Sequence, residues 1–319
     1  MESEPKLVSI IVPFLNEEEN LPLLYARVAE AFSALPEQFE LLLVDDGSTD
    51  NSPNWAKNQS REDSRVKLLR LSRNFGHQIA ITAGMDYASG DCAVIMDADL
   101  QDPPEIILEM IAEWKKGADV VYAVRRSREG ETFLKKLLAA GFYRFFRSIV
   151  KVNIPADAGD FRLLDRKVLD AISQLRETHR FVRGLTSWVG FTQSRVLYDR
   201  HSRNAGETKY PVWKSLRLAL DAVTSFSGAP LRLMTWVGLA LSSGSALLAI
   251  QVVLEKMRAP DHATPGWTSL FTLHLFLGGI QLISLGIAGQ YISRIYEETK
   301  RRPLYFVASK HGISKAPLP

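Results

Sequence analysis

Two long apolar stretches without charge constrain this chain more than any other feature. Residues 233–254 run for 22 positions without a charged side chain, and residues 267–293 run for 27 more. As a helix, each stretch is long enough to cross a hydrocarbon core of about 30 Å. The sequence therefore predicts a membrane anchor of two helices behind a larger domain.

The charges around these stretches predict how the anchor is oriented. Basic residues flank its outer ends (Lys214, Arg217 and Arg232 before it; Arg294, Lys300, Arg301 and Arg302 after it), whereas the connecting loop has only Lys256 and Arg258. Because positive charge favours the cytoplasmic side, both termini are expected in the cytoplasm. The short apolar run 7–15 follows acidic residues, which is unlike a signal peptide, so no export is expected.

Composition excludes several kinds of site and partner. The single cysteine, Cys92, cannot form an intramolecular disulfide or a cysteine-based zinc site, which fits a reducing compartment. The formal net charge of +3 is too small to indicate a nucleic-acid partner. We therefore look for chemistry in local motifs rather than in the overall charge.

From residue 7 to about 200, short β-branched runs alternate with longer amphipathic ones, which indicates an α/β domain with a largely parallel sheet. The predicted strands are 7–12, 40–44, 66–71, 92–96 and 119–124, and the predicted helices include 20–35, 77–88 and 104–116. Residues 133–150 resemble an interfacial helix. We divide the chain into a catalytic domain (1–210), a juxtamembrane interfacial helix (211–230), two transmembrane helices (231–295) and a cytoplasmic tail (296–319).

An Asp-x-Asp motif follows the predicted strand 92–96. Asp97 and Asp99 are spaced so that both can meet one divalent cation whose remaining positions accept phosphate oxygens, which is typical of diphosphate chemistry. Acidic pairs also occur simply as solvated loops, and the alternative for Asp102, before Pro103 and Pro104, is that it is just the N-cap of the next helix.

Two further polar turns follow earlier strands: residues 13–20 and the acidic turn 44–50. With the Asp-x-Asp they resemble the inverting nucleotide-sugar transferases of glycosyltransferase family 2, which have the GT-A fold. The resemblance implies that the nucleotide sugar is held by Pro13, Leu15, Glu17, Asp46, Asp97 and Ala98, and that Mg²⁺ or Mn²⁺ is held by Asp97, Asp99 and Gln101. The alternative for Asp46 is a turn-forming residue before Gly47.

Three more segments, 101–105, 157–163 and 200–210, are similar to polyprenyl-phosphate glycosyltransferases, the group of bactoprenol glucosyltransferases and dolichol-phosphate mannose synthases. This resemblance implies inverting transfer of a sugar from a nucleotide diphosphate sugar to a polyprenyl phosphate at the bacterial inner membrane. UDP-glucose and undecaprenyl phosphate are the favoured substrates, with GDP-mannose and modified pentose donors left open. A homo-oligomer is also left open.

The resemblance extends to the acceptor side of the reaction. The candidate basic residues for the two phosphates are Arg125, Arg128, Arg200, Arg203 and Lys209, and the alternative for each one singly is a solvated surface charge. Asp99 and Asp157 are the expected catalytic carboxylates, with Asp157 orienting the acceptor or taking its residual proton. The alternative for Asp157 is a structural role, bonded to a loop or to Arg162.

Three other functions compete with this one. A processive polysaccharide synthase would need more spans and a Gln-x-x-Arg-Trp motif, and this chain has neither. A catalytically silent nucleotide-sugar-binding subunit is disfavoured by the intact acidic residues. A transporter is disfavoured because two spans with few polar residues offer no pathway.

Overall fold

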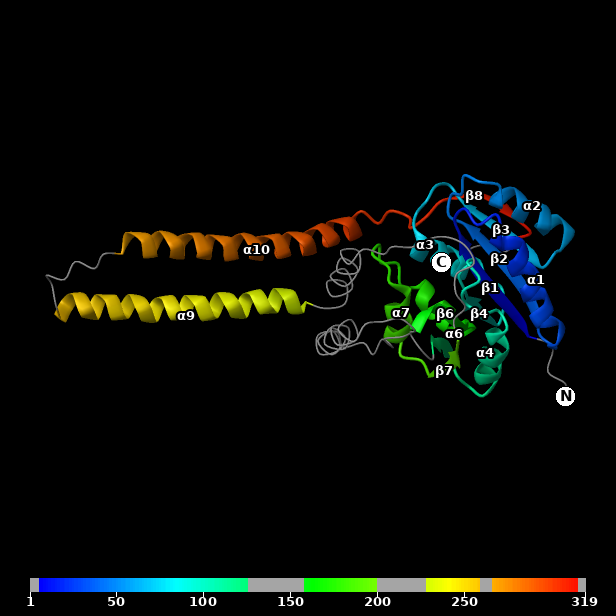
Figure 1. Cartoon of the computed structure of the whole chain (residues 1–319), viewed down its shortest axis with the longest axis horizontal. Helices are drawn as coiled ribbons and strands as arrows, with labels where there is room; N and C mark the ends of the chain where they lie inside the picture. The colour runs from blue at the N-terminus through cyan, green and yellow to red at the C-terminus, as the bar shows by residue number, and fades with distance from the viewer. Residues whose placement is uncertain (1–5, 126–157, 200–227, 259–265, 315–319) are drawn as a thin grey trace. The chain divides into compact units, whose positions relative to one another are not determined.

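The computed structural model describes residues 6–125, 158–199, 228–258 and 266–314, which fall into two compact units. The first unit contains the described residues up to 199 together with those from Arg302 onward, and the second contains two long helices (Figure 1). We describe each unit by itself.

The first unit is built on an eight-stranded sheet with the order β7-β5-β6-β4-β1-β2-β3-β8. The strands are β1 (Leu7–Phe14), β2 (Gln38–Asp45), β3 (Val66–Leu71), β4 (Cys92–Ile95), β5 (Val120–Arg125), β6 (Ala158–Asp165), β7 (Gln193–Tyr198) and β8 (Val307–His311). Strand β1 pairs in parallel with β2 and β4, β2 with β3, and β5 with β7, whereas β6 and β8 run antiparallel to their neighbours. The predicted α/β class with a mostly parallel GT-A-type sheet is confirmed.

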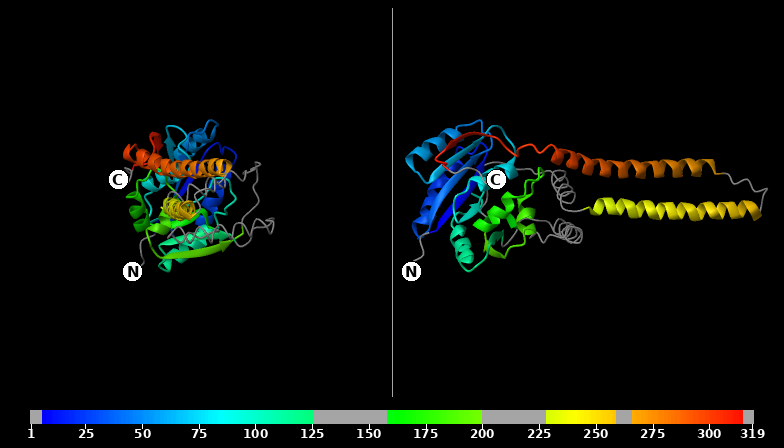
Figure 2. Two further views of the ribbon diagram at one scale, coloured as in Figure 1. Left: turned by 90° about the vertical axis from the view of Figure 1, so that its left-hand side faces the viewer. Right: turned by 180° about the vertical axis from the view of Figure 1, so that it is seen from behind.

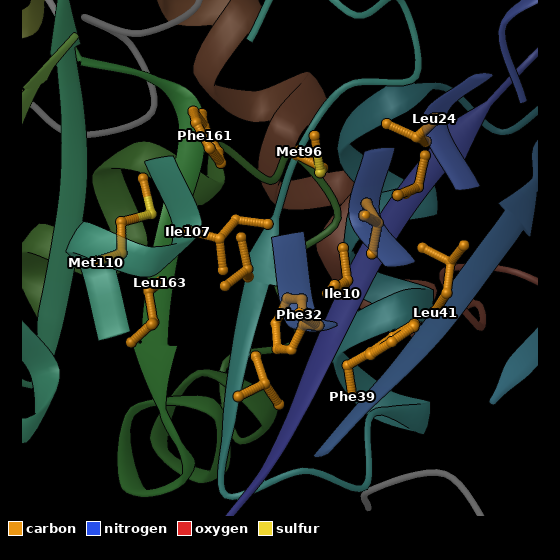
Figure 3. Close-up of a cluster of buried hydrophobic side chains, with 14 of the residues drawn as sticks. Ile10, Leu24, Phe32, Phe39, Leu41, Met96, Ile107, Met110, Phe161 and Leu163 are labelled. Atoms are coloured by element: carbon orange, nitrogen blue, oxygen red, sulfur yellow. The ribbon is translucent and has the colours of Figure 1, made fainter. Parts of the chain in front are cut away.

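The central strands are buried because helices cover both faces of the sheet. One face packs against α1 (Asn20–Ser33), α2 (Ser52–Glu62) and α4 (Ile106–Lys115), and the other against α3 (His77–Tyr87), α6 (Arg166–Ser173) and α7 (Val182–Trp188). Figure 3 shows part of the first core, where Ile10 and Leu41 of the sheet meet Leu24 and Phe32 of α1. Strands buried on both faces read as continuous apolar runs, which explains why the sequence revealed them.

The second unit consists of α9 (Ala229–Arg258) and α10 (Trp267–Thr299). Both helices contain a stretch long and apolar enough to cross a membrane, Pro230–Leu248 and Phe276–Thr299. Their large apolar side chains are exposed, as Trp236 at 70% and Leu282 at 71% illustrate. Such a surface is unfavourable in water and favourable in lipid.

The end of the chain differs from the sequence-based division. Residues 296–319 were expected to form a cytoplasmic tail, but α10 continues to Thr299 and Val307–His311 form β8 on the edge of the sheet. The return of the chain to the sheet is visible in Figures 1 and 2 as the red strand beside the blue elements of the first unit. Strands β6 and β7 were also not predicted. The interfacial segment 133–150 and residues 211–227 of the predicted interfacial helix 211–230 lie outside the described residues, and Ala229 and Pro230 of that prediction belong to α9.

Candidate active site

A cavity of about 430 Å³ opens at the carboxyl edge of the central strands. Parallel strands end on the same edge of a sheet, so the loops after β1, β2, β3 and β4 meet there. The cavity is lined by Pro13, Phe14, Leu15, Glu17, Asp46, Asn74, Gly76, His77, Ala80, Asp97, Ala98 and Asp99. The structure thus brings together all six residues predicted to bind the nucleotide sugar, and adds six that were not predicted for this role, among them the predicted metal ligand Asp99.

The loops after β1 and β2 are tied to each other and form one wall. Asn16 has a left-handed backbone with φ of 58°, which asparagine tolerates better than most residues. Its Oδ1 accepts a hydrogen bond from the Thr49 amide at 2.9 Å, and its own amide donates to Ser48 Oγ at 3.0 Å. The Glu17 amide donates to Ser52 Oγ at 2.9 Å. These bonds fix the backbone around Leu15 and Glu17 before any ligand arrives.

The Asp46 side chain binds the loop after β3, which forms the opposite wall of the cavity, rather than its own turn. Its Oδ1 accepts a hydrogen bond from the Phe75 amide at 2.7 Å, and its Oδ2 accepts one from the Gly76 amide at 2.9 Å. Burial raises the pKa of Asp46, although these two amides act in the opposite direction. The turn-forming alternative for Asp46 is wrong, because the side chain that accepts from the Ser48 amide, at 2.7 Å, belongs to Asp45.

The turn after β2 and the loop after β3 also approach each other at Gly47. This glycine has φ of +84°, and a Cβ at this position would lie 2.7 Å from the Asn74 nitrogen. A side chain is therefore excluded by both backbone conformation and space. Gly47 allows the two loops to close around Asp46.

The Asp-x-Asp motif presents a buried carboxylate oxygen that accepts no hydrogen bond, Asp97 Oδ1. Burial raises the pKa of Asp97 to about 6, because the charged form is poorly solvated. Asp99 Oδ1 accepts a hydrogen bond from the Gln101 amide at 3.2 Å. Between them, Leu100 adopts a left-handed φ of 58°, a conformation that is rare for leucine.

These residues fit a divalent cation. A buried carboxylate oxygen that accepts no hydrogen bond is stabilised by a cation, and hard cations prefer oxygen ligands. Within the described ranges, no three His, Cys, Asp or Glu side chains converge as they do in a closed metal site. Asp97 and Asp99 would hold the ion, and the oxygens of a diphosphate would suit its remaining coordination positions.

His77, at the start of α3, is a cavity residue that sequence reasoning missed. Its Nε2 lies 3.5 Å from Asp97 Oδ1 and 3.5 Å from Asp160 Oδ2. Burial alone would lower the pKa of His77, but the two carboxylates outweigh it and the pKa is raised. The two carboxylates thus favour the protonated, positively charged form of His77 in an otherwise acidic cavity.

Asp160 supports His77 from β6. Arg183 of α7 binds it through two contacts, Nε to Oδ1 at 2.7 Å and Nη2 to Oδ2 at 3.0 Å. Burial would raise the pKa of Asp160, but His77 and Arg183 hold it well below its usual range, so the carboxylate is charged. The motif 157–163 contained this residue, but only the packing of β6 against α7 shows its partners.

Of the remaining predicted site residues, the structure describes Arg125 and Gln101, and neither lines the cavity. Arg125 lies at the end of β5, where its Nε is 3.5 Å from the Tyr198 hydroxyl. That hydroxyl donates to Asp102 Oδ1, and α4 begins with Glu105 at its N-cap position. Arg128, Asp157, Arg200, Arg203 and Lys209 lie outside the described residues.

Comparison with known proteins identifies the family. The model of Glycosyl transferase family 2 matches residues 9–173. The chain belongs to this family. The family relatives include an uncharacterized glycosyltransferase of Bacillus subtilis (strain 168), YkcC, which is 52% identical over 305 residues, 96% of this chain and 94% of that protein. The bactoprenol glucosyl transferase of Shigella phage SfII is 40% identical over 304 residues, 95% of this chain and 98% of that protein.

Among solved structures, the chain is similar to mannosyl-3-phosphoglycerate synthase from Rubrobacter xylanophilus. The TM-score is 0.49 at 15% sequence identity, and the similarity covers 83% of this chain and 80% of that one.

Proposed function

We propose that this protein transfers glucose from UDP-glucose to a polyprenyl phosphate, undecaprenyl phosphate, at the cytoplasmic face of the bacterial inner membrane. The observation that carries the proposal is the convergence of Pro13, Leu15, Glu17, Asp46 and the Asp-x-Asp motif on one cavity at the strand edge. The relative named bactoprenol glucosyl transferase, similar over almost its whole length, supports the sugar and the lipid.

The proposed reaction is one in-line displacement. An oxygen of the lipid phosphate forms a bond to the anomeric carbon of glucose, the bond from that carbon to the diphosphate oxygen breaks, and UDP departs. The configuration at the anomeric carbon inverts. A divalent ion, Mg²⁺ or Mn²⁺, would neutralise the departing diphosphate when bound at Asp97 and Asp99. The two opposite walls, one fixed by Asn16 and the other by Asp46, would hold the nucleoside still during this step.

On the acceptor side, the proposal assigns phosphate binding to Arg125, Arg128, Arg200, Arg203 and Lys209. A phosphate monoester has a second pKa of about 6, so the acceptor is mostly a dianion at neutral pH and needs little help from a base. Asp157 is proposed to orient the acceptor or to take the residual proton. The apolar helices α9 and α10 would keep the enzyme at the membrane, where the lipid resides.

The test is a donor panel with the purified full-length protein in detergent or nanodiscs. UDP-glucose, GDP-mannose and a UDP-pentose are each incubated with Mg²⁺ or Mn²⁺, with and without undecaprenyl phosphate, and the released nucleotide diphosphate and the glycolipid are measured. We expect lipid-dependent release from UDP-glucose. Turnover with GDP-mannose alone would show that the transferred sugar is mannose rather than glucose. Donor binding without any turnover would indicate a catalytically silent binding subunit.

A further inference from the structure

The last described segment of the chain lies against the donor cavity's supporting elements, although it follows both apolar helices in sequence. We define the return segment as residues 302–313. It begins shortly after α10 ends at Thr299, and its strand β8 pairs antiparallel with β3, from Leu71 opposite Val307 to Leu68 opposite His311. Strand β3 would otherwise be an edge strand with unpaired backbone groups.

Two side-chain anchors fix the return segment to the catalytic unit. The Tyr305 hydroxyl donates a hydrogen bond to Asp86 Oδ2 at 2.8 Å, and Asp86, buried near the end of α3, also accepts two from Arg176. The ring of Tyr305 packs, with Val307, against the core between α3 and the sheet. Burial raises the pKa of Tyr305, so its hydroxyl stays protonated as the donor.

The return segment also holds the loop that forms one wall of the cavity. The carbonyl of Phe306 accepts a hydrogen bond from the Ser72 amide at 2.9 Å, at the point where the chain leaves β3. The next residues include Asn74 and Gly76, which line the cavity, and then His77. This loop is therefore fixed from two sides, by Phe306 at its beginning and by Asp46 near its end.

We propose that the return segment is a positioning element of the donor cavity, so that the cavity takes its binding shape only after the chain has passed through both apolar helices. Phe306 contacts the beginning of the 72–76 loop, and Tyr305 contacts Asp86 near the end of α3, the helix that follows this loop. Neither residue lines the cavity, so they act through the loop. The inference rests on the proposed function, since it takes this cavity to be the nucleotide-sugar site.

The test compares three full-length variants with wild type. Tyr305→Ala removes both the hydrogen bond and the packing, Tyr305→Phe removes only the hydrogen bond, and Phe306→Ala is the matched control. The Phe306 side chain is 58% exposed, and only its backbone carbonyl holds the loop. UDP-glucose affinity is measured by calorimetry well below all melting temperatures, and hydrogen exchange is followed in peptides covering 72–77 and 305–311.

We expect Tyr305→Ala to speed exchange in both peptides and to weaken UDP-glucose binding about tenfold, a loss of roughly 1.4 kcal/mol. Tyr305→Phe should fall between it and wild type, and Phe306→Ala should match wild type. Faster exchange at 305–311 with unchanged affinity would overturn the inference. If Tyr305→Ala does not fold, the same comparison is made with Tyr305→Phe. Absence of binding by wild type would instead refute the proposed function.

Discussion

Replacing Asp46 by asparagine tests whether the acidic turn after β2 is a structural support of the cavity. Each oxygen of Asp46 accepts one backbone amide, from Phe75 and from Gly76. In the variant, one of the two positions carries an NH₂ group, which cannot accept a hydrogen bond. Either the Phe75 or the Gly76 amide then loses its partner, and the loop before α3 loosens.

The magnitude follows from that single lost acceptor. A buried donor left without a partner costs about 1–3 kcal/mol, and the surviving bond is weaker because the acceptor is no longer charged. Part of the loss is offset because burial disfavours the charged form of Asp46, as its raised pKa indicates. We expect a net loss of about 2 kcal/mol, which lowers the melting temperature of a domain this size by roughly 4–8 °C.

Thermal unfolding followed by circular dichroism measures the loss of stability, and calorimetric titration measures the affinity for UDP-glucose. Asp99→Asn serves as the control, because it changes a carboxylate in the same cavity without touching the Phe75 and Gly76 amides. We expect only Asp46→Asn to melt early. An Asp46→Asn protein that melts within 1 °C of wild type but no longer binds UDP-glucose would refute the wall-supporting role and favour direct contact with the nucleoside.

Three further substitutions separate chemistry from stability. Asp99→Asn should abolish sugar transfer and weaken Mn²⁺ binding measured by electron paramagnetic resonance, and near-normal values of both would remove the metal assignment. Gly84→Ala should cost about 1–3 kcal/mol of folding free energy, because the new Cβ would lie 2.2 Å from Ile11 Cγ2. Part of this loss should be recovered in the double variant with Ile11→Ala, and a double variant whose loss is the simple sum of the two single losses would contradict this explanation. Burial alone would raise the pKa of Glu40, but hydrogen bonds from Lys67, Ser89 and Ser9 lower the pKa overall. Ionised Glu40 therefore stabilises the fold at pH values above the ordinary pKa of glutamate, and this stabilisation is lost as the pH falls. Glu40→Gln should therefore melt below wild type at pH 7 and approach it toward pH 3.5, whereas a constant gap would show that the charge is not responsible.

The sequence by itself determined the central strands and the set of residues predicted to bind the nucleotide sugar. Strands β1 and β2 are buried on both faces, so they are apolar along most of their length and stand out from the polar turns that follow. Since parallel strands end on one edge, Leu15, Asp46 and Asp97 could be placed together without knowing their contacts. The same reasoning located both apolar helices, because their length and lack of charge are local properties.

Only the tertiary structure decided the features whose partners lie far away in sequence. His77 is the first residue of α3 and belongs to no motif, and its place in the site is set by Asp97 and by Asp160 on β6, a strand that sequence reasoning did not predict. Strand β8 is five residues long, and it is a strand because β3 offers an open edge. These pairings depend on contacts between segments that are distant in sequence, whereas a local sequence pattern reflects only the surroundings of each residue within its own segment. This is why the residues that line the cavity could be grouped from the sequence and the elements that support them could not.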